Sequence, residues 1–224
     1  SGHEPDSGNT TNFQMTVTNN ANLTWLWTTN YWLETTSGSN GVVDVCSAWQ
    51  PSGVTTQITA SANLYFMFSN WSGSVSETNN PLQLPMDSPH SIEANFSALL
   101  ATNDTPQWWL AQYGWTNDVD AMATNDFDND GYFTWQEYIA DTHPTNPESH
   151  YPLLEMNASA TNLTLGINLT SANRHYFVDR TTLLDIPDRN NITNTPGNGE
   201  AWVLEIIPPR TGLHFFLSRV TLPP

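Results

Sequence analysis

Hydrophobic and polar residues alternate over many short stretches near both ends of the chain, which is the pattern of β-strands with one buried face. In the first hundred residues this pattern, with turn residues between the runs, predicts strands and a closing hairpin at residues 31–36, 42–46, 54–60, 65–71 and 82–96. These elements predict a small β module over residues 28–98, in a protein whose fold class is mainly β.

The segment 13–27 repeats the pattern of segment 82–96 without a gap. Apolar residues correspond at five positions, namely Phe13/Leu82, Met15/Leu84, Val17/Met86, Leu23/Ile92 and Trp27/Phe96. The strands that precede the hairpin in the second copy have no counterpart before the first. We therefore expect residues 1–27 to be a truncated preceding repeat that forms a β-hairpin.

Several stretches of the complete copy carry a family resemblance, namely residues 53–60, 68–73, 80–82 and 86–96. They resemble the divergent internalin-type B repeat, a small β-grasp-like module of bacterial surface proteins. The resemblance covers residues 28–98, and residues 1–27 as a half copy. It implies a spacer or adhesion unit without catalytic activity. For Trp71 we predict a place in the core, with a sugar-stacking platform as the alternative.

Residues 99–150 have a different character. Thr105 offers a capping hydroxyl and Pro106 favours the first helical position, so a helix is predicted over residues 107–113, with Gly114 just after its end. A second short helix is predicted over residues 134–140. The aromatic side chains of this stretch are predicted to form a small core of their own.

Residues 126–137 form a twelve-residue loop with acids at positions 1, 3, 5 and 12 and Gly131 at position 6. Calcium takes six to eight oxygen ligands, and a loop of this spacing supplies them from side chains and one backbone carbonyl. Gly131 permits the sharp turn that brings that carbonyl to the ion. The predicted ligands of one Ca²⁺ are Asp126, Asp128, Asp130, the carbonyl of Tyr132, and Glu137. Phe133 is predicted to anchor the loop in an apolar core.

The flanks of this loop differ from those of a paired EF-hand. A single loop resembles the calcium loops of dockerin or thrombospondin-type-3 modules. The run from 108 to 147 resembles a C-terminal cassette of very large secreted proteins of environmental bacteria. That cassette commonly has Asp where this chain has His143, so a second calcium site is doubtful there. Asp118 and Asp120 are weaker candidates for further ligands.

The C-terminal part returns to strands. Residues 163–169 alternate strictly, and further strands are predicted at 175–180, 202–207 and 213–220. The stretch 188–200 is rich in Asn, Gly and Pro and predicts a loop. Residues 151–224 are therefore predicted to form an antiparallel, fibronectin-like β-sandwich.

Charge excludes several classes of function. The chain has 22 acidic residues, five arginines and no lysine, and residues 1–173 carry no fixed positive charge. Nothing in this part could neutralise phosphates, so nucleic-acid binding is excluded. No apolar run is long enough to span a bilayer. Asn and Thr make up about a quarter of the chain, which is typical of a secreted or surface protein. The single Cys46 lies among alternating valines and predicts a buried thiol.

No catalytic motif is present, so we expect a non-enzymatic, calcium-stabilised structural or adhesive protein outside the cell, belonging to a surface fibre or filament. Self-association through residues 1–27 by strand addition is the expected mode of assembly. The alternatives are that residues 1–27 fold back on the adjacent repeat, or that the boundary is arbitrary. A carbohydrate-binding appendage of a secreted polysaccharide-degrading system, with a glycan as partner, is a second interpretation. A coplanar row of exposed tryptophans would favour it. A C-terminal sorting cassette is a third.

Overall fold

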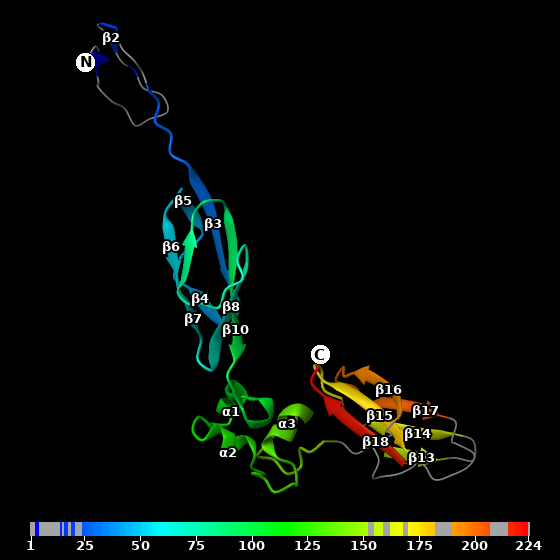
Figure 1. Ribbon diagram of the computed structural model, residues 1–224. Helices are drawn as coiled ribbons and strands as arrows, with labels where there is room; N and C mark the ends of the chain where they lie inside the picture. The colour runs from blue at the N-terminus through cyan, green and yellow to red at the C-terminus, as the bar shows by residue number, and fades with distance from the viewer. Residues whose placement is uncertain are drawn as a thin grey trace. The chain divides into compact units, whose positions relative to one another are not determined.

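The computed structural model describes residues 3–4, 14, 16–17, 19–20, 24–151, 155–158, 162–167, 170–181, 190–206 and 215–223. The described chain is mainly β, as predicted, with three short α-helices in its middle (Figure 1). It divides into two compact units, residues 1–63 with 68–96, and residues 64–67 with 97–224. Most of the predicted hairpin in residues 1–27 lies outside the described residues. Those described include β1 (His3–Glu4), which pairs antiparallel with β2 (Thr16–Val17).

The first unit is built on a sheet of four strands within the continuously described stretch 24–98, in the order β5-β3-β10-β8. These strands are β3 (Asn30–Ser37), β5 (Ala48–Pro51), β8 (Phe66–Gly73) and β10 (His90–Ala98). The last strand, β10, runs parallel to the first, β3. Two antiparallel pairs complete the unit: β4 (Gly41–Val43) with β7 (Ala60–Ala62), and β6 (Thr55–Ile58) with β9 (Leu82–Pro85).

Alternation places one face of these strands in a common core. Every second residue of β9 and of the start of β10 is buried, as period two requires of strands with one covered face. Trp71 is fully buried and lies in this core, as predicted. The complete core is Leu33, Ile58, Ala60, Trp71, Leu82, Leu84, Met86, Ile92 and Ala94.

The hairpin predicted for residues 82–96 is wrong. The strands exist, but β9 pairs with β6 and β10 pairs with β3. Met86, just after β9, is fully buried and extends the pairing with β6, because it exchanges backbone hydrogen bonds with the turn before β6. Its N–H donates to the Val54 carbonyl at 2.8 Å, and its own carbonyl accepts from Gly53 N–H at 2.9 Å.

The burial predicted for Cys46 is also wrong, because its thiol is exposed. Val43 and Val45 pack against the core, so the residues between and after them face outward. One of these is Asp44, whose carboxylate accepts a hydrogen bond from Thr59 N–H at 2.7 Å. Alternation was therefore present, with Cys46 on its solvent side.

The position after Trp71 and Ser72 requires a glycine. Its φ is +99°, and an added Cβ would lie 2.3 Å from the Ser91 carbonyl oxygen. We expect Gly73→Ala to lower the free energy of unfolding by about 2–3 kcal/mol, because both the backbone conformation and the close approach forbid a side chain. Gly53→Ala is the control, since its φ is also positive but no atom lies within 4 Å of an added Cβ. It should cost about 1 kcal/mol in urea unfolding. Equal losses would contradict the steric argument.

The helical part of the second unit contains α1 (Gln107–Gln112), α2 (Val119–Ala123) and α3 (Thr134–Ala140). Before them, β11 (Leu100–Ala101) pairs with β12 (Thr105–Pro106) around the 3-10 turn η1 (Thr102–Asp104). The predicted aromatic core is present. It contains Ala101, Trp109, Leu110 and Ala123, with Trp108, Tyr113, Trp115, Val119 and Tyr138 packed against them.

Two details of this part differ from the prediction. Pro106, and not Thr105, is the N-cap of α1, because the Thr105 hydroxyl donates instead to the Thr102 carbonyl at 3.0 Å. Helix α2 was not predicted. Its acidic residue Asp120 accepts hydrogen bonds from the backbone N–H and the hydroxyl of Thr102, at 2.7 and 2.9 Å. This contact with a distant turn helps to hold a helix that is too short to form alone.

The C-terminal part forms the predicted antiparallel sandwich. Among the described residues it has two sheets of three strands, β13-β14-β17 and β16-β15-β18. Their core draws on both sheets, with Leu163, Leu165 and Val178 buried at its centre. The strands are β13 (Glu155–Ala158), β14 (Leu163–Ile167), β15 (His175–Thr181), β16 (Asn190–Pro196), β17 (Trp202–Ile206) and β18 (Phe215–Thr221).

The loop predicted for residues 188–200 contains strand β16. Its Asn and Pro residues disfavour strands, yet it pairs with β15 from Asn190 to Pro196. Among the described strands it lies at the edge of its sheet, with a partner on one side, which lowers the demand on its sequence. Ile192 packs against the core of the sandwich and fixes which face turns inward.

Candidate metal centre

The acidic loop 126–137 lies between α2 and α3, and its ends are tied together. The carbonyl of Asn125 accepts hydrogen bonds from both the backbone N–H and the hydroxyl of Thr134, each at 2.9 Å. Thr134 is fully buried and begins α3, where the second helix was predicted. The local closure therefore brings the start of the loop beside the helix that carries Glu137.

The three aspartates converge. Asp126, Asp128 and Asp130 each offer a carboxylate oxygen, and these oxygens lie within 4.8 Å of one another. The backbone of the loop wraps around them. Asp126 accepts from Asn129 N–H at 2.8 Å and from Gly131 N–H at 3.0 Å, while Asp130 accepts from Tyr132 N–H at 2.8 Å. Positive φ values of 62° at Asn129 and 96° at Gly131 permit this tight path.

Glu137 comes from α3 and is only 1% exposed. Its Oε1 accepts a long hydrogen bond of 3.4 Å from the Thr142 hydroxyl, while its Oε2 is buried without a hydrogen-bond partner. The Oδ2 atoms of Asp128 and Asp130 are also buried without a partner. Three carboxylate oxygens are thus buried away from water, and no group in the described protein donates a hydrogen bond to them.

The electrostatics of the loop follow from this arrangement. The pKa of Glu137 is raised to about 8, first by burial and then by the charges of Asp128, Asp130 and Asp126, while the hydrogen bond from Thr142 opposes this rise. Burial also raises the pKa of Asp128, with the neighbouring charges of Asp130 and Asp126 adding to it. The loop therefore resists carrying its full negative charge unless a cation compensates it.

The donor set suits a hard divalent cation. Carboxylate oxygens are ligands that Ca²⁺ and Mg²⁺ prefer, and a loop with several of them favours the larger, more flexibly coordinated Ca²⁺. The structure thus brings together Asp126, Asp128 and Asp130, and places Glu137 within reach of their charges. Tyr132 contributes its N–H to Asp130. The role of its carbonyl as a ligand stays a prediction.

The predicted anchor of the loop is wrong. Phe133 is 47% exposed and serves as the N-cap residue of α3. Phe127 takes the anchoring role instead, since its ring stacks on Trp115 with centroids 4.3 Å apart and an interplanar angle of 20°. The even position 2 of the loop, and not position 8, therefore faces the aromatic core.

The other acids that were considered as ligands have different surroundings. Asp120 is engaged by Thr102, and Asp118 is the left-handed N-cap residue of α2. Three residues near the loop were missed by sequence reasoning: Asn125, Thr142 and Arg174. The last of these donates to the carbonyls of Tyr138 and Ile139 at the end of α3. Arg174 is the first fixed positive charge along the chain, and this was the available signal.

The tryptophans bear on the carbohydrate interpretation. Trp71 and Trp109 are buried in the cores. Trp32 and Trp49 are exposed and lie directly opposite each other on β3 and β5. Their rings meet edge to face, at 67° with centroids 5.5 Å apart, so they do not form one flat platform.

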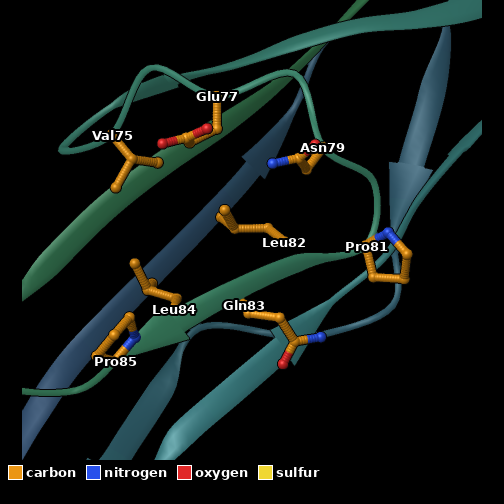
Figure 2. A pocket seen from close by; sticks show the side chains of 8 residues that line it. All are labelled: Val75, Glu77, Asn79, Pro81, Leu82, Gln83, Leu84 and Pro85. Atoms are coloured by element: carbon orange, nitrogen blue, oxygen red, sulfur yellow. The ribbon is translucent and has the colours of Figure 1, made fainter.

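Figure 2 shows a pocket of the first unit, on the side of β9. Leu82 and Leu84 are buried beneath it, and Glu77 is the one titratable side chain of its lining. A single carboxyl group offers no acid–base pair for catalysis. The pocket is lined by Val75, Glu77, Asn79, Pro81, Leu82, Gln83, Leu84 and Pro85.

Comparison with known proteins bears on the first unit. No curated protein and no solved structure matches the chain. Within the described residues, no helix has the length and apolar character needed to cross a bilayer. Residues 31–99, just under a third of the chain, match the divergent InlB B-repeat domain family. This match supports the resemblance described for residues 28–98 and indicates a repeat module of a surface or extracellular protein.

Proposed function

We propose that this chain is a non-enzymatic structural or adhesive protein outside the cell, in which the loop 126–137 binds one Ca²⁺ that stabilises the second unit. The observation that carries the proposal is the buried, unpartnered Oε2 of Glu137 beside the equally unpartnered Oδ2 atoms of Asp128 and Asp130. A buried carboxylate without a partner is costly, and a divalent cation at this point removes the cost.

A structural role suits the position of α3 better than a signalling role. Tyr138 of α3 packs edge to face on Trp109, with ring centroids 5.3 Å apart, and α3 also contacts β18 of the sandwich. A cation held by Glu137 therefore fixes a helix that contributes to both halves of this unit. Sensor loops work as coupled pairs that open a Met-rich groove, whereas one loop of this type is described here.

Calorimetric titration of the full chain tests this proposal. We expect Ca²⁺ to bind with a Kd of roughly 0.1–1 mM, the range of extracellular modules, and more tightly than Mg²⁺. At 100 times its Kd the ion would stabilise the unit by about 2.7 kcal/mol. No binding heat at about 10 mM Ca²⁺, well above that range, would refute the proposal.

A pair of variants locates the site. Asp130→Asn removes one charge from the cluster and should weaken Ca²⁺ binding at least tenfold. Asp118→Asn is its control, because Asp118 lies in the same part of the chain but outside the loop, and Asn tolerates its left-handed backbone. Its affinity for Ca²⁺ should match that of the unchanged protein.

Assembly into a filament through residues 1–27 stays a prediction, because most of those residues lie outside the described parts. A glycan partner and a sorting role for residues 151–224 stay predictions as well. The edge-to-face geometry of Trp32 and Trp49 does not favour the glycan interpretation.

A further inference from the structure

We infer that Arg174 couples cation binding at the loop 126–137 to the attachment of the C-terminal sandwich, so that the sandwich is held against α3 when the loop is occupied and is released when it is not. This inference rests on the proposed function. It assigns a role to the arginine that sequence reasoning did not use.

Arg174 joins the two parts of the second unit. It immediately precedes β15, and its side chain reaches the carboxyl end of α3. The Nε atom donates to the Ile139 carbonyl at 2.6 Å, and Nη2 donates to the Tyr138 carbonyl and lies 3.5 Å from an oxygen of Asp141. The guanidinium carbon is 5.6 Å from the centre of the Tyr138 ring. One side chain thus binds the end of a helix by hydrogen bonds, charge and ring contact.

The base of this contact is rigid. The carbonyl of Arg174 accepts a hydrogen bond from Gly197 N–H at 2.8 Å, which ties it to the end of β16. Gly197 packs closely on the preceding turn, since an added Cβ would lie 2.0 Å from the Ser171 carbonyl oxygen. The backbone of Arg174 is therefore fixed to the sandwich, which limits how far its guanidinium group can move with α3.

The contact also depends on the position of α3. The Arg174 side chain is only 10% exposed, so its donors need the helix carbonyls in place of water. The last carbonyls of a helix have no partner within it and carry the negative end of its dipole, which makes them suitable acceptors for a cation. The planar guanidinium fork requires two acceptors in a fixed geometry. If α3 shifts, a nearly buried charge keeps only the Asn173 carbonyl, 3.0 Å from Nη1, as a hydrogen-bond acceptor.

Cation binding acts on the same short helix. Glu137 directly precedes Tyr138 and Ile139, whose carbonyls Arg174 binds. Helix α3 has seven residues, too few to be stable without tertiary contacts. A cation held by Glu137 fixes the first half of α3, and Arg174 fixes its end. Two ligands that favour the same conformation of one element assist each other, and the coupling is reciprocal.

Reciprocity gives the test. Arg174→Met keeps an apolar stem but removes the hydrogen bonds, and it should weaken Ca²⁺ binding about fivefold or more in calorimetric titration, although Arg174 is not a ligand. The rise in Tm on adding Ca²⁺ should shrink as well, which a merely structural loss would leave unchanged. Arg174→Lys restores the charge without the fork and should fall between the two. The control is Arg180→Met, which removes a charge from β15, the strand that Arg174 precedes. Both α3 and β15 are fully described, and no hydrogen bond joins Arg180 to α3.

A second measurement uses the unchanged protein and decides the matter if Arg174→Met fails to fold. Ca²⁺ should slow hydrogen exchange of amides in residues 170–181, which are distant from the loop in sequence. If Ca²⁺ binds but exchange there and the affinity of Arg174→Met are unchanged, the coupling is refuted and the calcium site stands. If the unchanged protein binds no Ca²⁺, the proposed function fails and this inference falls with it.

Discussion

Replacing Glu137 with glutamine should have opposite effects on the protein with and without calcium. Without calcium, the variant should be more stable than the unchanged protein by about 2 kcal/mol at neutral pH. The pKa of Glu137 is about 8 in the fold, against about 4.3 in an unfolded chain, so folding requires the carboxyl group to take up a proton or to stay charged beside aspartates. An amide of the same shape avoids most of that cost. With calcium, the variant should be the less stable, because it loses a charged ligand.

Urea unfolding in the presence of calcium and of chelator measures both effects. Glu148→Gln is the matched control, since Glu148 is an exposed glutamate of the same unit outside the loop, and the change should alter the free energy of unfolding little in either condition. A Glu137→Gln variant that is destabilised equally in both conditions would show that Glu137 serves packing only. That outcome would remove the main support for the calcium proposal.

The largest loss of stability is expected for Trp71→Ala. Trp71 is fully buried, its ring lies 5.2 Å from that of Phe68, and its Nε1–H donates to the Asn79 carbonyl at 2.9 Å. Truncation leaves a cavity in the core of the first unit and an acceptor without its donor. We expect the free energy of unfolding of this unit to fall by about 3–5 kcal/mol.

Two further variants test whether the loss of stability comes from the burial of Trp71 or from the loss of any tryptophan. Trp49→Ala removes a side chain of the same type that is 66% exposed, and should cost less than about 1 kcal/mol. Trp71→Phe should cost an intermediate amount, because it keeps most of the volume and loses the hydrogen bond. Thermal unfolding followed by tryptophan fluorescence measures all three. Similar losses for Trp49→Ala and Trp71→Ala would contradict the assignment of Trp71 to the core.

The parts of the structure that the sequence predicts are those with local causes. The acids and the glycine of the loop lie within twelve consecutive residues, 126–137. Helix α3 has the bounds predicted for it. The alternation of residues 163–167 is likewise a local signal and yields strand β14. In these places the local pattern identifies the element, although α3 and β14 still need tertiary contacts to be stable.

The parts that were missed depend on distant partners. Strands β9 and β10 were found, but their pairing with β6 and β3 is set by contacts far apart in sequence. Helix α2 owes its start to the contact of Asp120 with Thr102, and β16 owes its strand conformation to β15. The outward orientation of Phe133 and the contact of Arg174 with α3 could not be predicted either, because no pattern in the neighbouring residues indicates them.

The parallel pairing of β3 and β10 has a mechanical consequence. Because the first and last strands of the repeat run side by side in the same direction, the chain enters the module at one end and leaves it at the other (Figure 1). Tension applied through the two connections then pulls these strands past each other, and the hydrogen bonds from His90–Leu33 to Ala94–Ser37 bear the load together. Such a shear geometry resists force better than unzipping bond by bond, so the module is suited to transmit tension between its two connections.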